Sequence, residues 1–91
     1  MLKPKYLTCD PPNEAEGVTY YTLVGLGEEP IEVPRSTGDE TCGFKFYLTD
    51  IPVGTYTVRA MACNEWTCSL ESNSVNFTKL AAPSPPELRL G

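Results

Sequence analysis

The chain contains no histidine, and this absence removes several kinds of catalytic site. Without an imidazole there is no Ser-His or Cys-His pair in which a base activates a nucleophile. Basic residues are also few: seven Lys and Arg against twelve Asp and Glu leave a net charge of −5. They are scattered along the chain, whereas a nucleic-acid groove needs clustered positive charge. We therefore expect neither an enzyme nor a nucleic-acid partner.

Long apolar runs and a sustained helical repeat are both missing. No run approaches the length that crosses a bilayer, so we expect no membrane partner. The N-terminal sequence MLKPKYLTCDPP has no apolar core or cleavage site and is not a signal peptide. Either export is handled in another way, or the chain is a fragment of a longer protein, or it leaves the cell within an assembly.

What is present favours one all-β domain. Nine prolines and seven glycines interrupt the 91 residues often, and β-branched and aromatic residues dominate the apolar runs. The pattern predicts six short strands, at 5–10, 18–24, 31–33, 42–49, 55–63 and 69–78. Short strands at this spacing are typical of a two-sheet antiparallel sandwich. We assign residues 1–79 to the sandwich and 80–91 to a proline-rich tail.

Alternation along each strand predicts which side chains face the core. The strand at 18–24 offers two inward sets, and we favour Val18, Tyr20 and Val24 over Tyr21 and Leu23. The inward residues expected in the three later strands are Cys42, Phe44, Phe46, Leu48, Tyr56, Val58, Ala60, Ala62, Val75 and Phe77.

Residues 46–77 resemble a fibronectin type III domain, and the first half of the chain resembles it loosely. Leu48 or Ile51, followed by Gly54 and Tyr56, is similar to that family's tyrosine corner, which implies a bond from the Tyr56 hydroxyl to nearby backbone. The A-C-N-x-x-x-C-S run from Ala62 to Ser69 resembles a disulfide-bearing hairpin in bacterial and phage members. The resemblance implies an immunoglobulin-like antiparallel sandwich.

The chain departs from the family pattern at both ends. Cys9 stands where the family usually has a core tryptophan, and there is no room for the family's first strand, strand A. Residues Ala82–Leu90 nevertheless resemble the start of such a domain, as if strand A were displaced to the C-terminus. Three interpretations stay open: a flexible linker, a tail folded back on its own domain, or a strand given to a neighbouring copy.

The four cysteines predict disulfides rather than a metal site, because an all-cysteine zinc site usually needs two close pairs. By strand parity Cys9 and Cys42 point inward, whereas Cys63 and Cys68 point outward. A disulfide joins side chains on a common face. We therefore predict Cys63–Cys68 across the hairpin and Cys9–Cys42 between neighbouring strands; four thiols are the alternative. No metal or cofactor is expected.

The loop between the last two cysteines, formed by Asn64, Glu65, Trp66 and Thr67, is the candidate binding site. A tryptophan on a disulfide-held hairpin tip loses little entropy on binding. The alternative is that its indole lies back on its own sheet.

These features predict a non-catalytic binding or structural module with a protein or glycan partner. Similarity to small bacterial and phage proteins implies a virion or cell-surface accessory role, and the disulfides indicate an extracellular setting. One alternative is a spacer or accessory domain of a larger extracellular hydrolase. Another is a secreted inhibitor that uses the hairpin as its wedge.

Overall fold

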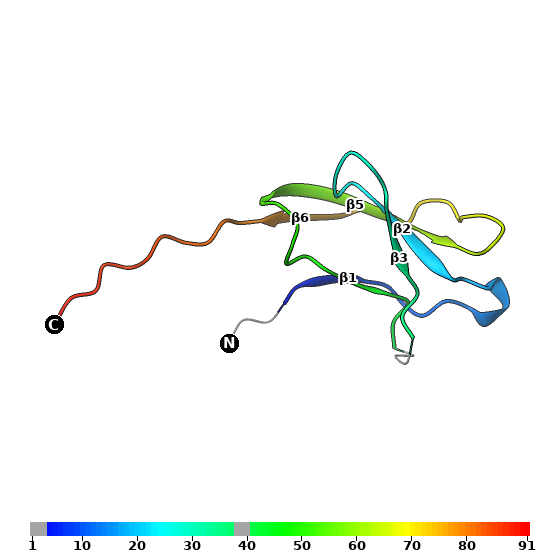
Figure 1. The fold of residues 1–91 in the computed structure, drawn as a ribbon, viewed down its shortest axis with the longest axis horizontal. Coiled ribbons are helices and arrows are strands. Elements are labelled where there is room, and N and C mark those ends of the chain that lie inside the picture. Colours follow the sequence, from blue (N-terminus) through cyan, green and yellow to red (C-terminus); the bar gives the residue numbers. More distant parts are fainter. Residues whose placement is uncertain (1–3, 38–40) are drawn as a thin grey trace.

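The structure, a computed structural model, describes residues 4–37 and 41–91. These residues form two antiparallel sheets, as predicted for an all-β sandwich (Figure 1). The smaller sheet pairs β1 (Tyr6–Thr8) with β4 (Lys45–Tyr47). The larger has the order β3 (Ile31–Pro34), β2 (Tyr20–Val24), β5 (Gly54–Cys63) and β6 (Val75–Lys79). A single 3-10 turn, η1 (Glu14–Glu16), lies between β1 and β2.

The core lies between the two sheets and draws side chains from both. Leu23 and Val58 belong to the larger sheet and are 1% and 4% exposed. Phe44, the residue just before β4, is 2% exposed. The ring of Tyr21 packs against Phe44 with its centroid 4.9 Å away. Removal of these apolar groups from water is the main force that holds the sheets together.

The inward face of β2 is the opposite of the one favoured from the sequence. Tyr21 and Leu23 are buried, whereas Tyr20 and Val24 are only half-buried. Val18 is buried as predicted, but it precedes the strand, which begins at Tyr20, so its burial does not report the parity of β2. The prediction failed because alternation was counted from a residue outside the strand.

The last two strands follow the predicted alternation except at one position. Tyr56 and Val58 face the core, and Phe77 stacks on the Tyr56 ring at 5.3 Å. Val75, expected to be inward, is 44% exposed. It lies on the edge strand β6 and lines an open groove rather than a packed layer, which explains the difference.

The return from the hairpin is irregular, so β6 begins at residue 75 rather than 69. The N–H groups of Ser69 and Ser72 donate to the carbonyls of Ala62 and Ala60, both at 2.8 Å. Three residues on one side thus span two on the other, as in a β-bulge. The serine hydroxyls also accept the Ala62 and Ala60 N–H groups, each at 3.0 Å, in place of backbone carbonyls. Serine side chains therefore replace part of the sheet ladder.

Residues 80–91 leave the sandwich as an extended, fully exposed segment, and Figure 1 shows them running away from both sheets. Lys79, at the end of β6, fixes the point of departure: its ammonium group donates to the carbonyls of Leu48, Thr49 and Ile51 at 2.9, 2.7 and 2.6 Å. The interpretation that the tail folds back on its own domain is therefore wrong.

Candidate functional site

The connection between β5 and β6 opens with a short hairpin, residues 63–68, closed by a disulfide. Cys63 and Cys68 are bonded, with their Cα atoms 4.0 Å apart, which confirms this predicted pair. The Asn64 N–H donates to the Thr67 carbonyl at 2.9 Å and closes the turn inside the disulfide. The hairpin is therefore held at its base by both a covalent bond and a backbone hydrogen bond.

The side chain of Asn64 fixes the backbone of this hairpin. Its Oδ1 accepts the N–H groups of Trp66 at 2.8 Å and Thr67 at 2.9 Å. Its Nδ2 donates to the Glu16 carbonyl at 3.1 Å and so ties the hairpin to η1. Asparagine commonly bonds the backbone two residues later, so its place at the start of the loop was a usable signal for this turn. The sequence-based interpretation treated Asn64 only as a surface contact.

Cys63 is fully buried, although the sequence predicted that it points outward. Its face was assigned correctly, because it pairs with Tyr20 on the side away from the core. Thr22 on the same face places its Oγ1 3.5 Å from the Cys63 Sγ, and the Tyr20 hydroxyl lies 4.0 Å from the Cys68 Sγ. Strand parity gives the face of the sheet on which Cys63 lies. It does not show that Cys68 and the side chains of Tyr20 and Thr22 cover Cys63 on that face.

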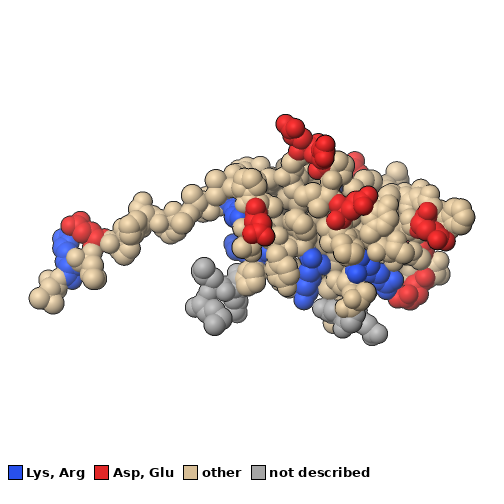
Figure 2. All heavy atoms as spheres, in the orientation of Figure 1, with Lys and Arg blue, Asp and Glu red and all other residues tan. Residues whose placement is uncertain are grey.

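Trp66 projects from the fixed turn into solvent. Its side chain is 85% exposed, so the alternative in which the indole lies on its own sheet is wrong. Leu70, two residues beyond the disulfide, is 92% exposed and adds a second large apolar group that the sequence-based interpretation missed. Glu65 and Glu71 flank them and are exposed. Figure 2 shows acidic side chains at the end of the molecule that carries this hairpin and η1.

A salt bridge stabilises the chain close to the hairpin. Arg35 bonds the Glu14 carboxylate on η1, and it also donates to the Val18 carbonyl at 3.3 Å. The hydrogen bond and the positive charge of Arg35 lower the pKa of Glu14. Glu14 is exposed, so we assign this pair a positional role rather than a large stabilising one.

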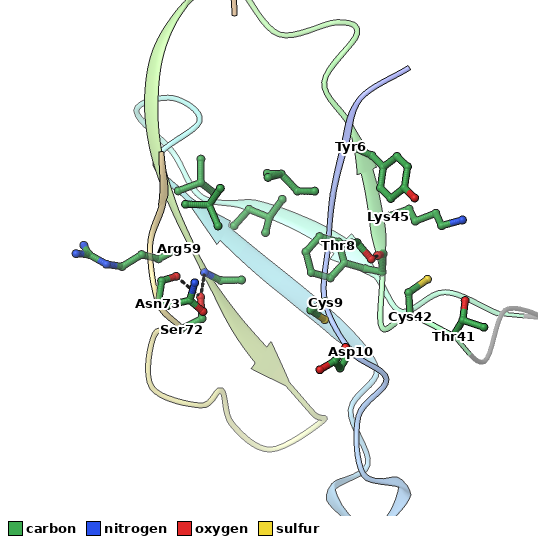
Figure 3. Close-up of a pocket in the computed structure, with 16 residues that line it drawn as sticks. Tyr6, Thr8, Cys9, Asp10, Thr41, Cys42, Lys45, Arg59, Ser72 and Asn73 are labelled. Carbon is green, nitrogen blue, oxygen red and sulfur yellow. Dashed lines mark hydrogen bonds between the residues drawn. The ribbon is translucent and has the colours of Figure 1, made fainter. Parts of the chain in front are cut away.

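Cys9 and Cys42 do not form the predicted disulfide, and this correction has a geometric cause. Both residues carry thiols. The Gly43 N–H donates to the Cys9 carbonyl at 2.9 Å, so Gly43 rather than Cys42 stands opposite Cys9. The Cys42 thiol lies 3.8 Å from the Ser36 Oγ and, in Figure 3, its sulfur points away from Cys9. Alternation was extended to residue 42, but β4 begins only at Lys45.

The surroundings of Cys9 are crowded. A Cβ on Gly43 would lie only 2.7 Å from the Cys9 Sγ and closer still to the Tyr21 hydroxyl. Burial raises the pKa of Tyr21 to about 12, and the Cys9 side chain contributes to the shift. The hydroxyl therefore stays neutral in the folded protein well above the pH at which tyrosine ordinarily ionises. The Cys9 side chain and the Tyr21 hydroxyl therefore form a packed polar contact beside Gly43.

Tyr56 makes the bond to nearby backbone that its resemblance to a tyrosine corner implies. Its hydroxyl donates to the Pro52 carbonyl at 2.6 Å, four residues upstream. This bond closes the turn between β4 and β5 and holds the start of the strand that ends in the hairpin.

A groove of about 550 Å³ opens between the two sheets on the side where β1 faces β5 and the segment leading into β6 (Figure 3). Leu23, Phe44 and Val58 form its apolar floor. One wall is the β1 segment from Tyr6 to Asp10, and the other includes Ser72. The sequence carried no direct sign of the groove, because its walls come from segments more than 40 residues apart.

Within residues 4–37 and 41–91, no group of His, Cys, Asp or Glu side chains is arranged to hold a metal ion. In the same part of the chain, no helix has the length and apolar character needed to cross a membrane.

Comparisons of the chain with protein-family models, with curated proteins and with solved structures found no match.

Proposed function

We propose that this chain is a non-catalytic binding module that contacts a partner protein through the 63–68 hairpin, with Trp66 at the centre of the contact. One observation carries the proposal: a tryptophan 85% exposed stands on a backbone fixed by a disulfide and by the Asn64 side chain. A large aromatic side chain that is exposed on a rigid turn has the properties of the residues that dominate protein interfaces.

The fixed backbone lowers the entropic cost of binding. A partner that buries Trp66 does not have to order the loop, which is already held by bonds at Asn64 and Cys63. Tryptophan is among the residues that most often dominate interface energies, and truncation of such an anchor typically costs about 2 kcal/mol or more.

A protein partner fits the hairpin better than a glycan does. Recognition of a sugar needs polar groups that can bond its hydroxyls, but both polar atoms of the Asn64 amide are already bonded within the domain. Leu70, the other large apolar side chain exposed on the connection from β5 to β6, offers apolar area only. The flanking carboxylates Glu65 and Glu71 favour a partner whose rim is basic.

We further propose that the module is a fibronectin type III-like domain in a virion or cell-surface accessory protein. The strand order β3-β2-β5-β6 opposite β1-β4 supports the family, as does the Tyr56 bond to the Pro52 carbonyl. The Cys63–Cys68 disulfide supports an oxidising, extracellular setting.

The test selects peptides from a random display library on the immobilised chain and measures their affinity for variants. We expect most binders to lose affinity at least tenfold for Trp66→Ala and to retain it for Tyr47→Ala, an aromatic residue 50% exposed on β4. Titration of the indole fluorescence with chitin and cellulose oligosaccharides should produce no saturable change. Binders that ignore Trp66→Ala, or a saturable response to a sugar, would contradict the proposal.

A further inference from the structure

Among the described residues, the smaller sheet contains two strands, β1 and β4, so each strand forms one edge of it, and the β1 edge borders the groove. The Lys5 carbonyl accepts from Leu48 and the Cys9 carbonyl accepts from Gly43, both at 2.9 Å. Successive residues of a strand direct their backbone groups to opposite sides. Tyr6 and Thr8, which alternate with Lys5 and Cys9, therefore direct their N–H and C=O groups away from β4.

The groove described above runs beside this open edge. Its lining includes Tyr6 and Thr8, and also Leu7, Ala60 and Val75, which keep part of their apolar surface exposed above the buried Leu23, Phe44 and Val58. A strand added along β1 would satisfy the outward backbone groups and cover these partly exposed apolar groups with alternate side chains. Exposed edges of this kind readily accept an additional strand.

The chain itself carries a segment with the matching properties. Residues 82–90 are extended and exposed, and Leu88 and Leu90 are 94% and 101% exposed. In a strand these two leucines lie on one face, with Glu87 and Arg89 on the other. Residues 87–90 contain no proline, so each can donate its N–H to a ladder. Pro83, Pro85 and Pro86 precede them and restrict the pairing to this four-residue stretch.

We propose that residues 82–90 of a second copy of this chain add as a strand to the open edge of β1, with Leu88 and Leu90 in the groove. The four residues that can pair, 87–90, span about 13 Å when extended, whereas β1 (Tyr6–Thr8) spans about 10 Å, so the segment is long enough. Its own domain is not the acceptor, because the tail leaves the sandwich beyond β6 and runs away from the groove (Figure 1).

The contact joins two different surfaces, a tail and a sheet edge. Such a heterologous contact can repeat from copy to copy, or it can close if two copies exchange tails. In either arrangement, self-association depends on the tail leucines and on the β1 edge. It does not involve Trp66, so it stands or falls separately from the proposed function.

The first experiment measures the solution mass of the whole chain by light scattering across a wide concentration range. We expect the mean mass to rise with concentration in the natural sequence. It should stay at 10.0 kDa in the double variant Leu88→Asp/Leu90→Asp. Leu70→Asp is the control, since it places one such charge on a leucine 92% exposed outside the tail and should still associate.

The second experiment tests the groove directly with a labelled peptide of sequence AAPSPPELRLG, added to the double variant. We expect saturable binding, with amide chemical-shift changes and slowed hydrogen exchange at Tyr6 and Thr8. A peptide with aspartate in place of both leucines should bind about 100-fold more weakly or worse, given the burial energy of two leucines. A monomer at every concentration would overturn the proposal, as would peptide binding that leaves Tyr6 and Thr8 unchanged.

Discussion

The side-chain amide of Asn64 donates a 3.1 Å hydrogen bond to the backbone carbonyl of Glu16, a residue 48 positions earlier in the chain. The same side chain accepts the N–H groups of Trp66 and Thr67. One residue therefore sets the shape of the hairpin and attaches it to the rest of the domain. The orientation of Trp66 depends on a contact that spans half of the sequence.

Replacement of Asn64 by alanine should loosen the hairpin without unfolding the domain. The variant loses three hydrogen bonds, and we expect a loss of about 1–3 kcal/mol in the free energy of unfolding because these groups are largely exposed. The fluorescence anisotropy of Trp66 should fall as the indole gains freedom. Asn76→Ala, on the exposed face of β6, is the control and should change neither quantity. Unchanged anisotropy in Asn64→Ala would show that the disulfide alone orders the loop.

The thiol inventory gives a second prediction. Denatured but unreduced protein should take up two iodoacetamide groups, at Cys9 and Cys42, and reduction should raise the number to four. Mass spectrometry of the alkylated peptides measures this directly. If no label is taken up before reduction, Cys9 and Cys42 are bonded to each other, as strand parity predicts.

Sequence reasoning succeeded where a signal is local and failed where the chain departs from a regular strand. Alternation in 55–63 placed Tyr56 and Val58 toward the core, because that strand is ten residues long and unbroken. The same rule failed for Tyr20, because alternation was counted from Val18, which lies outside β2. Cys42 is buried as predicted, but it lies before β4, so strand parity did not place it opposite Cys9.

The candidate site was predictable only in part. Strand parity predicted the Cys63–Cys68 disulfide, but the sequence left open whether the Trp66 indole is exposed or lies on its own sheet. Leu70, the bond from Asn64 to Glu16 and the groove along β1 depend on how distant segments meet. No periodicity within one segment reports such contacts.

Removal of the Tyr56 hydroxyl should destabilise the domain while leaving the core packing in place. Tyr56→Phe keeps the ring stacked on Phe77 but leaves the Pro52 carbonyl without its donor. We expect the free energy of unfolding, measured in urea, to fall by about 1–2 kcal/mol. Tyr47→Phe, which alters a half-exposed ring on β4, should cost less than about 0.5 kcal/mol. Equal midpoints for the two variants would mean that the bond to Pro52 contributes nothing net.

The buried hydroxyl of Tyr21 should make the domain less stable in alkali. Burial raises its pKa from 10.0 to about 12, so in this interval the unfolded chain has lost a proton that the folded chain keeps. The unfolded state then binds fewer protons, and the free energy of unfolding falls as the pH rises. The contribution is complete below pH 10 and is lost by about pH 12. Urea midpoints across this range should fall less steeply for Tyr21→Phe, whereas Tyr47→Phe should keep the steeper fall.

Lys79 makes three hydrogen bonds to carbonyls of the β4–β5 turn, and its loss should free both that turn and the end of β6. Lys79→Met keeps the aliphatic stem but removes the donors to Leu48, Thr49 and Ile51. Because hydrogen bonds from a charged group are stronger than neutral ones, we expect a loss of about 2–3 kcal/mol in urea unfolding. The acceptors are neutral, so high salt should not reduce the difference between variant and natural chain, as it would for a surface ion pair. Arg89→Met, in the exposed tail, removes the same charge without a partner in the sandwich and should leave the midpoint unchanged. A difference that vanishes in high salt would mean that Lys79 acts through the acidic surface of the domain rather than through these carbonyls.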